Sequence, residues 1–291
     1  MLNTPVQHFN KTRIAPTPSG YLHLGNALSF ALTAALARKT GAKILLRIDD
    51  LDQQRANLLY IQDIFDTLNF LNIPWDEGPR DVEEYKSSWS QLHRLDNYNI
   101  ALKQLEQQGA VFACQCSRAQ LQGNIYPGTC RNKAIPLDTP HTAWRLYTDE
   151  KDLSIHILND GIIKTKLPDT MKDFIVKKKD GYPSYQLASL LDDLHFGVDL
   201  IVRGQDLYPS TIAQHYLASV LHKETFQSIT FHHHPLLMES GDKKLSKSAG
   251  STSIKYLREL GKTPEDVYEE IGRMLGIEED LRSFTNFVNL V

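Results

Sequence analysis

"TRIAPTPSGYLHLGNALSFALTAALARKTGAKILLRI", residues 12–48, decides the fold class of this chain. It opens with a short β-like piece and closes with a continuous apolar run at 43–48, as expected of a strand covered on both faces. The middle is typical of a helix, because apolar residues recur on one helical face: Leu28, Leu32, Ala35 and Leu36. Gly41 suits the C-cap of that helix. Strand, helix and strand at this spacing predict a parallel sheet in a doubly wound α/β domain.

The remaining sequence predicts an interruption of this domain. A second amphipathic helix is expected up to Pro74, and a third from Gln91 to Gln108 with Gly109 as its stop. Short β-rich pieces follow, "AWRLYT", "LSIHIL" and "DFIVKKK", before the helical "YQLASLLDDL" and the buried strand "LIVRG". Two helix patterns close the chain. We therefore expect four segments: 1–109 and 181–250 as halves of one domain, 110–180 as an insertion, and 251–291 as a C-terminal helical segment.

Composition predicts a soluble globular protein. Of the 291 residues, 41% are hydrophobic and 23% charged, and the net charge is −3. No apolar stretch approaches the ~20 residues of a membrane span, and no secretory signal is evident. The odd, clustered cysteine count argues against a disulfide framework. We expect a cytoplasmic protein with no membrane contact and no obligate protein partner. The basic run "KKKDG" at 177–181 is interpreted as a solvated turn.

Two segments are suited to binding phosphates. In "RIAPTPSGYLHLGN" (13–26), Gly20 and Gly25 allow close backbone approach, and the helix start offers free N–H groups to an anion. "KKLSKSAG" (243–250) is suited to a mobile loop that closes on phosphates. Each motif alone is weak, since a lone His at a strand end is usually structural. Neither is a Walker loop or a dinucleotide fingerprint.

Taken together and in this order, the two segments resemble the HIGH and KMSKS signatures of class I aminoacyl-tRNA synthetases. Two further blocks, "LLRIDDLDQQR" and "DGYPSYQLASLLDDLHFGVDLIVRGQDL", are similar to the glutamate branch of that family. The resemblance runs from about residue 11 to 260. It implies a Rossmann-like doubly wound parallel sheet with an inserted α+β subdomain that binds tRNA.

The resemblance implies activation of an amino acid by ATP with Mg²⁺. A carboxylate attacks the α-phosphorus, so positioning and charge stabilisation suffice without a protein nucleophile. The catalytic positions are His23 and Lys247. The implied ATP-binding positions are His23, Gly25, Asn26, Lys244, Ser246 and Lys247.

The resemblance also implies a glutamate site, with the positions Arg13, Ala15, Ser19, Asp49, Tyr185 and Arg203. Two guanidiniums suit a substrate with two carboxylates. Taken alone, the two arginines are better interpreted as structural ion-pair residues, and Tyr185 as a core aromatic. The branch usually has Glu where this chain has Asp49. The shorter carboxylate resembles the version of this segment in the glutaminyl enzymes. Arg203 nevertheless favours glutamate, because a buried guanidinium requires a carboxylate rather than an amide.

All three cysteines lie within "CQCSRAQLQGNIYPGTC" (114–130). The spacing alone leaves zinc and no function equally open, because zinc normally takes four ligands. A redox pair is disfavoured, since C-x-C is tighter than C-x-x-C. The segment resembles the glutamyl-queuosine enzymes, which implies a structural zinc held by Cys114, Cys116, Tyr126 and Cys130. "FHHHPL" (231–236) is not interpreted as a metal site, because consecutive histidines in a strand alternate faces.

The segment after the KMSKS-like motif is short, 249–291. We therefore expect a shortened member of the branch. In this respect the chain resembles enzymes that activate L-glutamate without tRNA and attach it to queuosine in the anticodon of tRNA(Asp). Two alternatives stay open: a truncated enzyme that charges a tRNA 3′ end, and a non-catalytic tRNA- or nucleotide-binding paralogue.

Overall fold

The computed structural model describes residues 7–121, 123, 125–239, 243–244, 253–277 and 281–290. The chain forms two compact units. The first comprises Met1–His93, Val198–Gln205 and His232–Val291, and the second comprises Arg94–Gly197 and Asp206–Phe231. The predicted insertion, 110–180, lies within the second unit. Its role as a separate tRNA-binding subdomain stays a prediction.

The first unit is built on a β-α-β crossover. Strands β1 (Lys11–Ile14) and β2 (Lys43–Leu46) pair in parallel, and helix α1 (Leu24–Thr40) connects them. Gly41 ends α1 in the left-handed region at φ 78°, where its N–H donates to the carbonyl of Ala37. The strand, helix and cap predicted from the sequence are confirmed.

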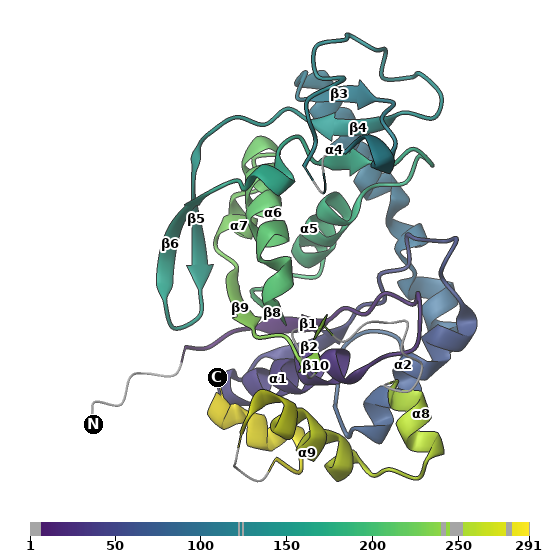
Figure 1. Cartoon of the computed structure of the whole chain (residues 1–291), viewed down its shortest axis with the longest axis vertical. Coiled ribbons are helices and arrows are strands. Elements are labelled where there is room, and N and C mark those ends of the chain that lie inside the picture. Colours follow the sequence, from purple (N-terminus) through teal and green to yellow (C-terminus); the bar gives the residue numbers. More distant parts are fainter. Residues whose placement is uncertain are drawn as a thin grey trace. The chain divides into compact units, whose positions relative to one another are not determined.

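Helices and further short strands complete the first unit (Figure 1). Strand β8 (Leu200–Gly204) lies beside β1, where the Asp199 N–H donates to the Lys11 carbonyl at 3.0 Å. The Tyr268 hydroxyl donates to the carbonyl of Leu71, which fixes the C-terminal helices on the unit. The other elements of this unit are α2 (Leu58–Phe70), α3 (Val82–Glu84), the π-turn η1 (Tyr85–Trp89), β10 (Met238–Glu239), β11 (Lys243–Lys244), α8 (Ile254–Glu259), α9 (Pro264–Leu275) and η7 (Phe284–Leu290).

The second unit combines a helical layer with two groups of strands (Figure 1). One sheet has the antiparallel order β3-β4-β7, and β5 pairs antiparallel with β6 and parallel with the start of β9. Its strands are β3 (Val111–Cys114), β4 (Ala143–Leu146), β5 (Asp152–Ile157), β6 (Gly161–Lys166) and β7 (Ile175–Lys177), and β9 (Thr230–His234) begins here and continues into the first unit at His232. Its helices are α4 (Leu95–Gln107), η3 (Arg118–Gln120), η4 (Asp169–Met171), α5 (Tyr185–His195), α6 (Tyr208–Val220) and α7 (Glu224–Gln227).

A buried ion pair joins two helices of this unit. Arg94 donates to both carboxylate oxygens of Asp192 at 2.8 and 3.1 Å, and the Tyr98 hydroxyl donates to the same carboxylate at 2.7 Å. The two short turns η2 (Gln91–Arg94) and η5 (Gln205–Leu207) lie where the chain passes between the units.

The third predicted helix begins later than expected. Residues 91–94 form a 3₁₀ turn instead, because the Gln91 N–H donates to Asp50 and the Leu92 N–H to the Ser90 hydroxyl. These side chains replace the carbonyl acceptors of a regular α-helix. Regular α-helix starts at Leu95.

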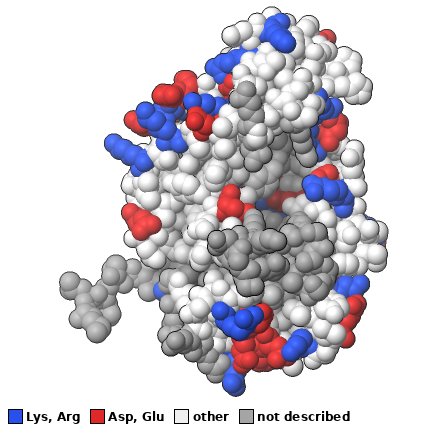
Figure 2. Space-filling model, viewed as in Figure 1, with Lys and Arg blue, Asp and Glu red and all other residues white. Residues whose placement is uncertain are grey.

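The turn predicted at "KKKDG" forms, with the Gly181 N–H donating to the Lys178 carbonyl. All three of its lysines have specific partners: Lys177 lies over the ring of Trp144, Lys178 pairs with Asp180, and Lys179 donates to the carbonyl of Gln115. Figure 2 shows one face of the molecule, where basic and acidic side chains are interspersed. Within the described residues, no helix is both long and apolar enough to cross a membrane.

Candidate active site and metal centre

His23 caps the first helix of the crossover. Its Nδ1 accepts from the Gly25 N–H at 3.1 Å, and the Asn26 side chain accepts from the His23 N–H at 3.1 Å. Because Nδ1 accepts here, this geometry assigns the proton of the neutral ring to Nε2. The capping box therefore fixes a histidine N–H donor at the positive end of α1.

Gly25 is required by close packing rather than by its backbone angles. A Cβ at this position would lie 3.0 Å from Cε1 and 3.1 Å from Nδ1 of His23. Any larger residue would therefore displace the imidazole.

The second signature lies mostly outside the described residues. Ser246 and Lys247 fall there, and Lys244 is described only by its backbone in β11, which pairs antiparallel with β10. The chain then returns to the His23 turn, because Ser253 forms a β-bridge with His23 and the Ile254 N–H donates to the Leu22 carbonyl at 2.8 Å. Ser253, the first described residue after the second signature, is thus fixed beside the first signature.

Arg13 and Arg203 are buried in the first unit. Arg13 is 5% exposed and donates to the Val202 carbonyl at 3.3 Å, and Arg203 on β8 is 3% exposed. Burial, and then the charge of Arg203, lower the pKa of His233 to about 3, with smaller effects from Arg13 and the adjacent histidines. A neutral histidine therefore shares the surroundings of both arginines.

Asp49 is held by a residue that the sequence reasoning missed. Its carboxylate accepts from Arg47 Nε at 2.7 Å and Nη2 at 3.1 Å, and the Arg47 side chain is buried. The pairing orients the Asp49 carboxylate within the unit. The sequence signal for this pairing is the basic residue followed by two acidic residues in "RIDD" (47–50).

Asp50 was missed as well. It accepts from the hydroxyls of Tyr85 at 2.6 Å and Ser90 at 2.5 Å, and from the Gln91 N–H at 2.8 Å. Three donors satisfy this buried carboxylate, so Asp50 fixes the chain that follows α3 and has a structural role.

The other predicted glutamate positions are divided between the units. Ala15 and Ser19 are half-buried in the first unit, in the turn that follows β1. Tyr185 is the first residue of α5 in the second unit and is 42% exposed. Its place beside the arginines stays a prediction.

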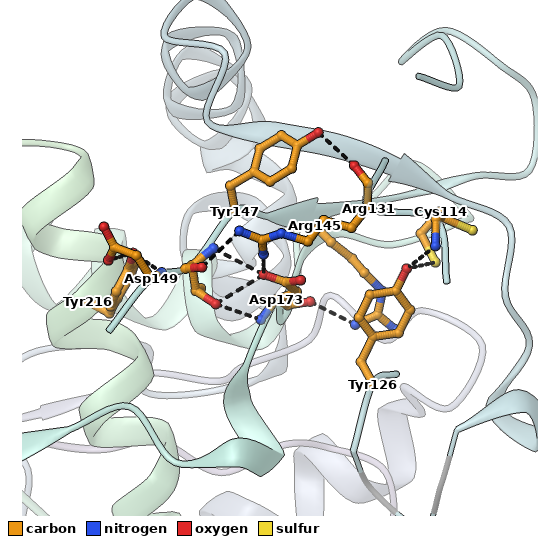
Figure 3. Close-up of polar contacts among 10 residues, drawn as sticks. Cys114, Tyr126, Arg131, Arg145, Tyr147, Asp149, Asp173 and Tyr216 are labelled. Atoms are coloured by element: carbon orange, nitrogen blue, oxygen red, sulfur yellow. Dashed lines mark hydrogen bonds and ion pairs between the residues drawn. The ribbon is translucent and has the colours of Figure 1, made fainter. Parts of the chain in front are cut away.

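The three cysteines of the second unit converge. Their Sγ atoms all lie within 4.8 Å of one another, and those of Cys116 and Cys130 are 3.6 Å apart. The Tyr126 hydroxyl lies 3.7 Å from Cys114 Sγ and accepts from the Cys130 N–H at 2.7 Å (Figure 3). Tetrahedral zinc with Zn–S bonds of ~2.3 Å places two sulfurs about 3.8 Å apart. The spacing of the donor atoms fits such an ion.

The chemistry of the donor set also fits a cation. Burial raises the pKa of Cys114, but hydrogen bonds from Arg145 and the Cys116 N–H outweigh this and leave it below its usual value. Burial, and then the neighbouring thiols, raise the pKa of Cys116 to about 11. One thiolate is therefore favoured, and a bound cation would stabilise the others. Among the described residues, no other group of three or more His, Cys, Asp or Glu side chains converges in this way.

Comparison with known proteins identifies the family. The family model for class I tRNA synthetases (E and Q), catalytic domain, matches residues 10–135 and 138–290. The chain belongs to this family. Membership places it among the aminoacyl-tRNA synthetase-type ligases, as the sequence motifs predicted.

Relatives within the class I synthetases carry two names. A Glutamyl-Q tRNA(Asp) synthetase of Symbiobacterium thermophilum is 34% identical over 91% of this chain and 86% of its own length. A Glutamate--tRNA ligase of Anaeromyxobacter sp. (strain K) is 32% identical over 94% of this chain. The chain spans 59% of the length of that ligase.

Solved structures of the class I synthetases share the fold. The Glutamate-tRNA Synthetase from Elizabethkingia anophelis superposes with a TM-score of 0.76 at 22% identity, over 96% of this chain and 65% of that one. This likeness confirms the predicted Rossmann-like α/β fold class.

Proposed function

We propose that this chain activates L-glutamate with ATP and transfers it to the queuosine base at the wobble position of tRNA(Asp). The observation that carries the proposal is the group of relatives named Glutamyl-Q tRNA(Asp) synthetase, which are 33–36% identical over 86–92% of this chain. The His23 turn supports the first step, and the cysteine cluster supports the second.

In the activation step, the glutamate carboxylate attacks the α-phosphorus of ATP and pyrophosphate leaves. The fixed Nε2–H of His23 and the N-terminus of α1 stabilise the charge that develops on the α-phosphate. Lys247, with Lys244 and Ser246, binds the departing pyrophosphate, while Gly25 and Asn26 keep the turn close to the nucleotide. Mg²⁺ bound with ATP neutralises phosphate charge.

Glutamate binding uses opposite charges. Arg13 and Arg203 bind the two carboxylates of the substrate, and Asp49, oriented by Arg47, binds its ammonium. Ala15, Ser19 and Tyr185 complete the site. Because His233 is neutral, it adds no third positive charge that would weaken the pairing with ammonium.

The cysteine cluster has a structural role in the proposal. Zinc held by Cys114, Cys116, Cys130 and Tyr126 has a closed set of four ligands and no open position for substrate. When bound, it cross-links β3 to the turn at 126–130. The 110–180 segment thus shaped holds the anticodon loop, since unstacked single-stranded bases suit such recognition. The described cysteines are free thiols, which supports a cytoplasmic location.

The activation step is tested by ATP–pyrophosphate exchange without tRNA. We expect exchange that depends on L-glutamate and does not occur with L-glutamine, because an amide cannot satisfy the second buried guanidinium. Exchange that requires tRNA, or none in folded protein with zinc and Mg²⁺, contradicts the activation step. Loss of exchange would favour a non-catalytic paralogue.

A further inference from the structure

Arg145 is a buried cation beside the cysteine cluster. It lies on β4, is 6% exposed, and its guanidinium carbon is 3.8 Å from the centre of the Tyr126 ring. Its Nη1 donates to the Asp173 carbonyl at 2.8 Å, whereas its Nε has no hydrogen-bond partner among the described residues. Figure 3 shows its side chain extending from the strand to the face of Tyr126.

No carboxylate within the described part of the chain pairs with Arg145. The nearby Asp173 carboxylate is already bound by Arg131 and by the N–H and hydroxyl of Thr148. A buried guanidinium without a counter-ion is strongly destabilising. An anion is therefore expected at its other face, where Tyr126 and Cys114 lie.

The proposed metal centre is such an anion. Three thiolates carry three negative charges and Zn²⁺ two positive ones, so the centre is negative even with a neutral Tyr126 hydroxyl. One fixed positive charge offsets this excess, and a metal-ligand shell is typically completed by such outer contacts.

We propose that Arg145 is the counter-cation and positioning residue of the metal centre. Its charge offsets the anionic ligands beside Cys114, and its planar face holds the Tyr126 ring with the hydroxyl toward the sulfurs. The inference rests on the proposed zinc site and deepens it.

A polar network fixes Arg145 in this position. The Asp173 carbonyl that accepts from it belongs to a residue at φ 47°, which is held by Thr148. Arg131, which follows Cys130, donates to the same Asp173 and to the Thr148 carbonyl. Arg131, the neighbour of Cys130, and the cation Arg145 are therefore anchored to one aspartate (Figure 3).

The test is zinc affinity, measured by chelator competition on the full chain. We expect R145Q to weaken zinc binding about 10- to 100-fold, as loss of outer-shell partners does. R145K, which keeps the charge but not the planar face, should fall between R145Q and wild type. R80Q is the matched control, because Arg80 also stacks on an aromatic ring, Trp75, and donates to backbone carbonyls, but lies in the first unit. It should bind zinc as wild type does.

The charge role has a second, independent test. C116H replaces a half-buried thiolate with a neutral ligand and removes one negative charge. In this background R145Q should cost much less zinc affinity than it does in wild type. If R145Q alone fails to fold, folding is compared instead, and the R145Q substitution should be tolerated in the C116H background.

Three results would overturn the inference. The first is equal zinc affinity of R145Q and wild type. The second is zinc binding by R145K that is no tighter than by R145Q. The third is an R145Q substitution that, in the C116H background, lowers zinc affinity or prevents folding as much as it does in wild type. A wild-type chain that binds no zinc would refute the metal centre itself, which is a distinguishable result.

Discussion

At the scale of single residues, the helix cap formed by His23 is also the catalytic donor of the proposed function. The Gly25 N–H fixes the imidazole through Nδ1, so the same contact that begins α1 also directs the Nε2 proton. Stability and chemistry depend on one hydrogen bond, and a substitution can separate them.

G25A is the substitution that separates them. Alanine favours a helix over glycine by up to about 1 kcal/mol, which offsets the weakened His23 cap, so the melting temperature should change little. The new Cβ would lie 3.0 Å from the imidazole and displace it, so ATP–pyrophosphate exchange should fall by about 10-fold or more. S29A, on the same helix but away from His23, should leave exchange unchanged. Wild-type exchange in G25A would show that the imidazole position does not matter.

His233 predicts a pH dependence of stability. Its pKa is about 3 in the folded chain, against an ordinary value of 6.5, because burial and Arg203 disfavour the charged ring. The unfolded chain therefore binds an extra proton between about pH 3 and 6.5. The stabilisation is fully present above pH 6.5 and is lost as pH falls through that window.

The measurement is the urea midpoint at pH 7.5 and pH 5. H233N should show a smaller drop between the two pH values than wild type does. H222N is the control: His222 is exposed and at φ 54°, a conformation that asparagine tolerates. An equal drop in H233N and wild type would contradict the assignment.

At the scale of elements, the sequence predicted those whose burial follows a simple pattern. Helix α1 and strands β1, β2 and β8 were found because their buried faces are apolar. Helix α6 was missed because many of its buried residues are polar: Ser210, Thr211, Gln214 and His215. Strand β6 was missed because it is mostly exposed and is defined by its pairing with β5, which no local pattern reports.

In the candidate site, too, residues with a local sequence pattern were predicted and residues defined by contacts in the folded chain were missed. Spacing and family resemblance named the cysteines and the tyrosine, and the structure brings their donor atoms together. Arg47 and Arg145 were missed, because each acts through a partner that only the folded chain places beside it.

Metal removal tests the role of β3 and the turn that follows it. A chelator should increase amide hydrogen exchange in 111–131, because the cross-link between Cys114 and Cys130 is lost. Helix α1 in the first unit should keep its protection, which serves as the internal control. Uniform loss of protection in both units, or no change in either, would contradict a local structural role.

At the scale of the whole molecule, the class I synthetase family model matches residues of both compact units, including the cysteine-bearing segment in the second. The first unit holds the His23 turn and the buried Arg13 and Arg203, which are the proposed ATP and glutamate positions. The second holds the candidate metal centre. In the proposed function these parts activate an amino acid, and the acceptor of that amino acid is what separates this proposal from the function of a glutamate–tRNA ligase.

The acceptor is identified directly by mass spectrometry of nuclease digests. The chain is incubated with ATP, isotopically labelled L-glutamate and tRNA(Asp), either with or without queuosine. We predict one glutamyl residue on the queuosine nucleoside of the modified tRNA, and none on the unmodified tRNA. Label on the 3′-terminal adenosine, equal in both tRNAs, would contradict the account.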